Sequence, residues 1–265
     1  MNPDLSQVLS SHGVDPAAFN VSSRGVLTGV VPSEDVLALW HALREAFPKT
    51  GRWPVIRGSA DSFEGPEESE DEPNIQPPTA SIRHILNDRF KERCELLNEA
   101  AKGFNPNETF EVAAALADGS GVYSFGGRSG TQAPWPASSD AKELNLQTLD
   151  AAGSDDVVLV LVPVKHPSDV PIALGFGGWN ECPMPELLAA ALKEWQTRFD
   201  AVPICITDSV LECFVGKPPS SEADCTALAA EQWVLCEDIV SQGTQSVRAL
   251  AIELQDSPGW FFWWD

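Results

Sequence analysis

The sequence predicts an α+β fold in which a C-terminal mixed sheet has helices packed on one face. Residues 157–164 form a continuous apolar run, which is typical of a buried strand. Residues 202–207 and 210–215 alternate around Asp208-Ser209 and predict a hairpin. Leu188, Leu192, Trp195 and Phe199 recur at helical spacing.

The N-terminal region predicts a smaller β-α-β unit followed by a long helix. Residues 26–31 read as a strand, Ser33 as the N-cap of a helix that ends before Gly51, and residues 53–56 as a second strand. A long helix is expected from Thr79 to about Gly103. The Gly-, Ser- and Pro-rich residues 118–140 are expected to form a loop.

The C-terminal region predicts further elements after the strand at 157–164. A strand is expected at 171–176, a helix at 185–199, and a strand at 259–265 after two more helices. Ser221 and Asp224 form a capping-box-like start for the first of those helices, and Thr244 is expected to cap the second. One arrangement compatible with the order from residue 171 is a ferredoxin-like split βαβ. We therefore divide the chain into an N-terminal region, 1–150, and a C-terminal domain, 151–265.

Charge restricts the classes of partner. The 39 acidic and 17 basic residues give a formal net charge of −22, which disfavours nucleic acids and anionic membranes and favours a basic protein partner. The acidic loop at 60–78 concentrates this charge, because residues 61–73 hold seven acids and no base. It can be a docking segment for a basic protein or a solvated insert that keeps the protein soluble.

Other features point to a reducing, aqueous compartment. The chain has no apolar run long enough to span a bilayer and no export signal at its start, so we expect a cytoplasmic location. Its six Cys show neither CxxC pairs nor zinc spacing and are expected to be buried thiols. The four His lie in no catalytic or metal motif. We therefore predict neither a metal nor a cofactor.

A candidate binding site gathers around a glycine-hinged turn. Gly177 and Gly178 permit close backbone approach, and indole rings would supply the walls of a pocket. The alternative is that these side chains only pack the core or cap a helix. A general acid–base pair of Glu181 and Glu212 would require their carboxylates to approach each other. The predicted binding residues are Trp179, Asn180, Glu181, Trp233, Gln242, Trp263, Trp264 and Asp265.

Several C-terminal motifs resemble a bacterial family known as domain of unknown function 4253. They are residues 177–183 (GGWNECP), the helix with Trp195, residues 217–219 (KPP), residues 236–240 (CEDIV) and the terminal FWWD. The resemblance covers about residues 156–265. It implies a domain boundary and a bacterial cytosolic protein, and it carries no activity with it.

Three functions remain open from the sequence. The first is a binding or interaction protein with an acidic surface, for example in bacterial defence or toxin neutralisation. The second is an enzyme that uses a Trp-lined pocket with Asn180, Glu181 and Glu212. The third is a structural module in which every Trp is packed in the core.

Overall fold

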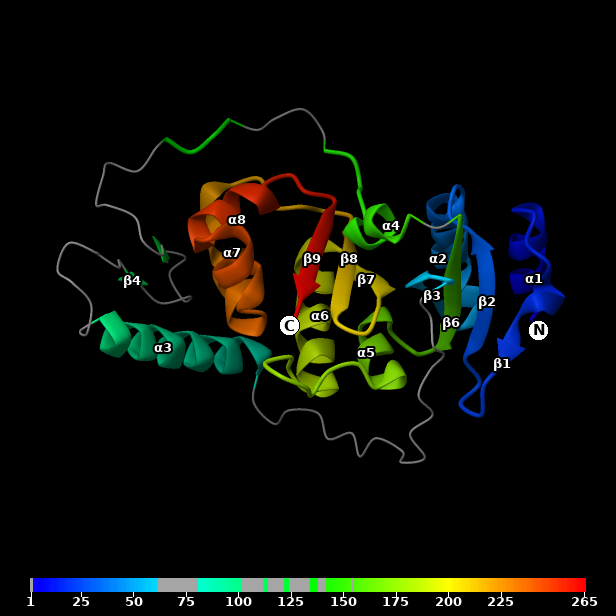
Figure 1. Cartoon of the computed structure of the whole chain (residues 1–265), viewed down its shortest axis with the longest axis horizontal. Coiled ribbons are helices and arrows are strands. Elements are labelled where there is room, and N and C mark those ends of the chain that lie inside the picture. Colours follow the sequence, from blue (N-terminus) through cyan, green and yellow to red (C-terminus); the bar gives the residue numbers. More distant parts are fainter. Residues whose placement is uncertain are drawn as a thin grey trace.

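A computed structural model describes residues 2–61, 81–101, 112–113, 122–123, 134–137, 142–153 and 155–265. In this part of the chain a mixed sheet of seven strands runs through the molecule (Figure 1). From one edge to the other its strands are β1 (Asn20–Val21), β2 (Leu27–Pro32), β6 (Asp156–Pro163), β3 (Arg52–Ser59), β7 (Ala201–Ile206), β8 (Val210–Val215) and β9 (Gly259–Trp263). A separate short pair joins β4 (Val112–Ala113) to β5 (Val122–Tyr123).

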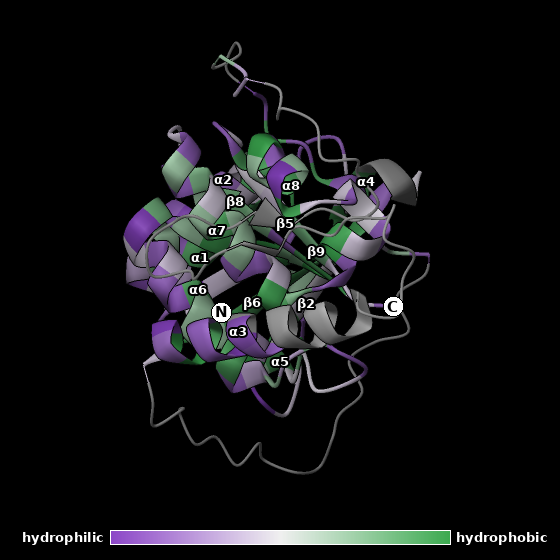
Figure 2. Cartoon of the chain, turned by 90° about the vertical axis from the view of Figure 1, so that its left-hand side faces the viewer, coloured by the Kyte–Doolittle hydropathy of each residue, from purple (hydrophilic) through white to green (hydrophobic). Residues whose placement is uncertain are grey.

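Helices surround this sheet. They are α1 (Pro3–Ser11), α2 (Val36–Thr50), α3 (Ile82–Ala101), α4 (Gln147–Ala152), α5 (Val170–Leu174), α6 (Pro185–Phe199), α7 (Glu222–Leu235) and α8 (Val247–Leu254). A π-helical turn, Ile239–Thr244, joins α7 to α8. Figure 2 shows mainly hydrophobic strands at the centre and hydrophilic residues on the outer sides of the helices. No helix of the described segments is long and apolar enough to cross a membrane.

The predicted α+β class with a mixed sheet is confirmed. The strand at 157–164 is β6, the hairpin is the antiparallel pair β7–β8, and the helix at 185–199 is α6. Ser221 caps α7 as expected, because its hydroxyl accepts the backbone N–H of Asp224 at 3.1 Å. Local periodicity and capping chemistry were sufficient for these elements.

The predicted strand at 171–176 is wrong, because Val170–Leu174 form the short helix α5 and Gly175 ends it. Pro171 occupies the first turn of the helix, where its missing N–H costs no hydrogen bond. Gly175 ends the helix with a positive φ of 67°. A short apolar run fits a buried strand and a buried helix equally well, so periodicity could not separate them.

The split β-α-β arrangement is not formed by the residues from 171 onwards, but by the N-terminal strands together with β6. β2 and β3 are joined by α2, and β6 lies between them, antiparallel to both. β3 then pairs with β7 in parallel, which connects the two halves of the sheet. The N-terminal region and the C-terminal domain therefore share one sheet, and the division near residue 150 stays a prediction.

Two predicted helix caps are also wrong. Asp35, not Ser33, precedes α2, and its side chain makes no capping bond. Ser246, not Thr244, caps α8 by accepting the N–H of Ala249 at 3.0 Å. Most of the acidic loop at 60–78 and of the loop at 118–140 lies outside the described residues.

Aromatic rings fill the core on the α6 side of the sheet. Trp195 of α6 stacks on Phe262 with ring centroids 5.6 Å apart and meets the edge of Trp260 at 5.7 Å. Near the sheet centre, the indole N–H of Trp53 donates to the Pro203 carbonyl at 2.8 Å. Buried aromatic contacts of this kind give β9 a fixed position, and β9 forms part of the site described next.

Candidate functional site

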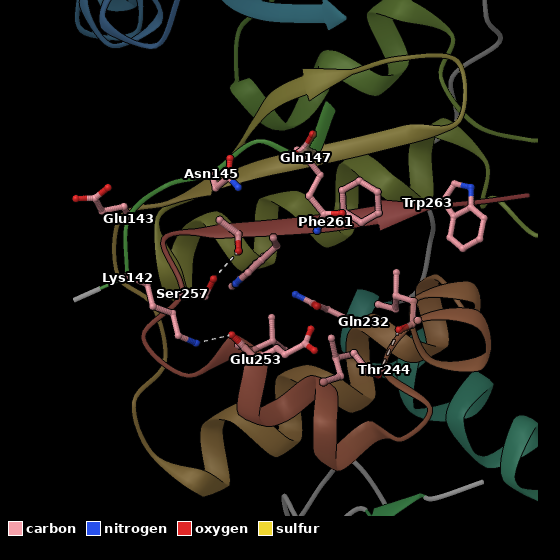
Figure 3. A pocket seen from close by; sticks show the side chains of 17 residues that line it. Lys142, Glu143, Asn145, Gln147, Gln232, Thr244, Glu253, Ser257, Phe261 and Trp263 are labelled. Atoms are coloured by element: carbon pink, nitrogen blue, oxygen red, sulfur yellow. Dashed lines mark hydrogen bonds between the residues drawn. The ribbon is translucent and has the colours of Figure 1, made fainter. Parts of the chain in front are cut away.

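A cavity of about 550 Å³ lies beside β9 (Figure 3). Its walls come from β8 and β9, from residues 142–147, and from α7, α8 and the turn between them. Residues far apart in sequence are thus brought together only by the packing of these elements. The volume falls within the range of about 300–1,000 Å³ that is usual for small-molecule sites.

Strand alternation directs aromatic rings into the cavity. Successive side chains of β9 point to opposite faces, so Trp260 and Phe262 are buried towards α6. Phe261 and Trp263 face the other way, are half-buried, and line the cavity. The same alternation that fills the core with two rings therefore supplies two rings to the site.

Glu212 fixes the wall formed by residues 142–147. It lies on β8 opposite Phe261 and is 2% exposed. Its carboxylate accepts the backbone N–H groups of Gln147 and Thr148 at 3.0 and 2.9 Å. These are the first two residues of α4, where the helix N-terminus favours a negative charge. Glu212 thus holds the start of α4 against the sheet.

Gln232 contributes a buried amide to the inner wall of the cavity. It follows Glu231 in a run of α7 that is buried on all sides. Glu231 is satisfied, because it accepts the Trp195 indole N–H at 2.9 Å and pairs with Arg198 at 2.7 Å. The Nε2 of Gln232 is buried and has no hydrogen-bond partner among the described residues. Figure 3 shows this side chain pointing between β9 and α8.

The mouth of the cavity carries more negative than positive charge. Lys142, Glu143 and Glu253 are exposed residues that line it. The Lys142 ammonium donates to the carbonyl oxygen of Glu253 at 3.0 Å and so ties residues 142–147 to α8. Although Glu253 is exposed as a residue, partial burial of its carboxyl raises the pKa of that group, and the nearby Lys142 partly offsets this. Three carboxylates, including Glu212, thus line the cavity with one ammonium.

Of the predicted site residues, Trp263 and Glu212 line the cavity. Trp233 and Trp264 are buried in the core, with 0% and 1% of their surface exposed. Gln242 and Asp265 meet at a different place, because both bond to the carboxylate of Asp238. These residues therefore do not form a single pocket.

The glycine turn lies beside the α6-facing side of β9. A Cβ on Gly177 would lie 2.3 Å from the Pro183 carbonyl oxygen, so the tight turn requires glycine there. Trp179 packs on Phe176, which in turn contacts Trp264. Asn180, with a φ of 45°, and Glu181 are both exposed.

This placement separates the two proposed catalytic carboxylates. Glu181 does not line the cavity, and Glu212 already binds two backbone amides. The described residues contain no group of three or more His, Cys, Asp or Glu arranged to hold a metal ion. The geometry therefore offers polar and aromatic binding groups at one place.

Sequence reasoning missed Gln232, Lys142, Glu253 and Phe261. One signal for Gln232 was present, since Gln232 and Glu231 are the two polar residues in the otherwise apolar segment from Ala229 to Val234. A second signal was the alternation of residues 259–263, which separates Phe261 and Trp263 from Trp260 and Phe262. Lys142 and Glu253 gave no local signal.

Comparison with known proteins identifies the C-terminal part. Residues 158–265 match the family model of a domain of unknown function (DUF4253). No curated protein and no solved structure matches the chain. The matched residues include β7, β8, β9, α7 and α8, whereas the wall at 142–147 precedes them. The C-terminal part of this chain therefore belongs to the DUF4253 family of domains.

Proposed function

We propose that this chain is a binding protein and that the cavity beside β9 is its ligand site. The observation that carries this proposal is the buried amide Nε2 of Gln232, which has no partner among the described residues and lies at the wall of a cavity. A buried donor without an acceptor costs about 1–3 kcal/mol. A ligand that supplies the acceptor would recover part of that free energy.

The rest of the lining supports binding. Phe261 and Trp263 give apolar area, and Gln232 gives a directed polar contact. Apolar walls with few convergent polar groups are the usual composition of a ligand site. An enzyme that uses Glu181 and Glu212 has less support, because only Glu212 reaches the cavity and it already holds α4.

We further propose a bacterial, cytoplasmic protein that binds a basic partner. The net charge of −22 supports such a partner. Five cysteines, Cys182, Cys205, Cys213, Cys225 and Cys236, are buried and free of disulfides, which suits a reducing compartment. A docking role for the acidic segment at 60–78, and a role in defence or toxin neutralisation, stay predictions.

The test uses the indole N–H of Trp263 as a reporter in NMR spectra of the ¹⁵N-Trp-labelled full chain. The probes are four small molecules: N-acetylglycine methylamide, acetate, butylamine and methyl phosphate. We expect at least one to shift the Trp263 signal saturably. The indole signal of Trp40, buried between α2 and β3, should stay fixed.

Matched variants control for the location of binding. Gln147→Phe places a bulky ring at an exposed position of the cavity wall and should abolish the shift. Gln7→Phe makes the same change at an exposed position of α1 and should leave it intact. If neither these probes nor a peptide shifts Trp263, or if Gln147→Phe leaves the shift unchanged, the cavity is not a ligand site.

A further inference from the structure

β9 presents an unpaired backbone edge among the described strands. In the antiparallel β8–β9 pair, hydrogen-bonded and non-hydrogen-bonded residues alternate. Val215 donates to the Pro258 carbonyl at 2.8 Å, and Trp264 donates to the Ser209 carbonyl at 3.1 Å. These two bonds set the parity, so the even-numbered residues of β9 bond to β8. Gly259, Phe261 and Trp263 therefore direct their backbone N–H and C=O groups away from β8.

Two of these outward carbonyl groups already have partners at the ends of the strand. The carbonyl of Gly259 accepts the Ser257 hydroxyl at 2.7 Å, and that of Trp263 accepts the Cys236 thiol at 3.0 Å. Phe261 lies between them and lines the cavity. The outward N–H and C=O of Phe261 have no partner among the described residues. The middle of the edge thus offers one donor and one acceptor.

The groups opposite this edge complete a pattern of polar contacts. The Gln232 amide supplies a second donor from α7, and Trp263 supplies an aromatic face. A ligand that satisfies both Phe261 and Gln232 needs acceptors and a donor spaced along an extended chain. A peptide backbone has this alternation of C=O and N–H groups, and it pairs with sheet edges in many complexes.

Charge decides which peptide fits. Glu143 and Glu253 at the mouth and Glu212 inside outnumber the single ammonium of Lys142. An acidic side chain would meet like charges here, whereas a Lys or Arg side chain would meet opposite ones. The net charge of the whole chain acts in the same direction on approach.

We propose that the ligand is a short extended peptide segment that carries a basic side chain and pairs with the edge of β9 at Phe261. This rests on the proposed function and specifies its ligand. The edge from Gly259 to Trp263 spans about 14 Å at roughly 3.4 Å per residue, so about four or five peptide residues can lie along it, and the one opposite Phe261 pairs with it.

The direct test is binding of N-acetyl-alanyl-lysyl-alanine methylamide to the full chain. At saturation, hydrogen exchange of the Phe261 amide should slow by about ten-fold or more, since the bound backbone protects it. Exchange at Phe262, whose N–H already faces β8, is the internal control. Binding itself is followed by NMR titration of the Trp263 indole.

Two altered peptides separate the backbone from the charge. N-methylation of the lysyl amide removes its N–H donor and places a methyl group where the paired strand would lie. Replacement of lysine by glutamate reverses the charge of the side chain. Each change should weaken binding by about ten-fold or more, as expected for the loss of one charged or backbone hydrogen bond. Gln232→Met should also weaken binding about ten-fold, whereas Gln7→Phe should not change it.

The outcomes distinguish the two proposals. If another probe shifts Trp263 but the lysyl peptide does not bind, the peptide proposal is overturned and the binding site stands. Equal binding of the methylated peptide also overturns strand pairing. Equal binding of the glutamyl peptide overturns the basic specificity. If neither the peptide nor any small probe binds, both proposals are overturned.

Discussion

Replacement of Glu212 should detach α4 from the sheet and lower stability. The carboxylate accepts two backbone N–H groups, and it is 2% exposed, so water competes little for it. A hydrogen bond to a charged group contributes about 1.5–3 kcal/mol. Gln147 is exposed, so in the variant its backbone N–H can hydrogen-bond to water instead. We therefore take the lower value, about 1.5 kcal/mol, for each bond. Glu212→Ala should then lower the free energy of unfolding by about 3 kcal/mol.

The conservative variant gives a graded result. Glu212→Gln keeps one acceptor oxygen and places an amide N–H₂ against the second backbone N–H. It should therefore lose at least one of the two bonds, or about 1.5 kcal/mol. Urea unfolding followed by Trp fluorescence measures both values, provided that the slope with denaturant stays the same. Glu181→Ala, a change to an exposed carboxylate, is the control and should alter stability by less than about 0.5 kcal/mol.

Hydrogen exchange locates the effect. In Glu212→Ala the amides of Gln147 and Thr148 should exchange faster, while those of Ile204 and Cys205 in β7 change only with global stability. The reasoning is refuted if Glu212→Ala unfolds within about 0.5 kcal/mol of the native chain and these two amides keep their protection. In that case another contact, and not Glu212, would hold the start of α4.

Three further predictions concern buried polar groups and pH. Gln232→Leu should raise the free energy of unfolding by about 1 kcal/mol in urea, because it removes a buried donor that lacks a partner; a clear loss of stability would contradict this. Glu231→Gln should lower it by about 2 kcal/mol in the same assay, because the pairing with Arg198 is weakened; an unchanged midpoint would exclude that role. Burial raises the pKa of the Cys182 and Cys236 thiols to about 12 from an ordinary 9.0. The contribution of these two neutral thiols to stability is therefore complete below pH 9 and is lost as the pH rises towards 12. The urea midpoint should fall over that range. Rapid labelling of either thiol by iodoacetamide at pH 8 would contradict the raised pKa values.

The elements with strong local signals could be predicted from the sequence. Eight apolar residues at 157–164 left little choice but a buried strand, and Ser221 with Asp224 marked the start of α7. The hairpin at Asp208-Ser209 followed from two alternating runs separated by a short turn. In these cases the interactions that define the element lie within a few residues of one another.

The candidate site could be predicted only in part. The sequence placed Trp263 and Glu212 in a binding group, and both line the cavity. It grouped them with Trp179, which is also aromatic, and with Trp264 and Asp265, which directly follow Trp263 in the chain. Period-two alternation turns Trp264 to the face opposite Trp263, so neighbours in sequence became members of different surfaces.

The sequence by itself determined the α+β class, the positions of most strands and helices, the strong negative charge and the family of the C-terminal part. Only the tertiary structure decided that β6 lies between β2 and β3, that residues 170–174 are helical, and that residues 142–147 close a cavity against β9, α7 and α8. The physical reason is range. Helix periodicity, strand alternation and caps act over a few residues, whereas sheet order and cavity walls depend on contacts between segments tens of residues apart, which no local pattern records.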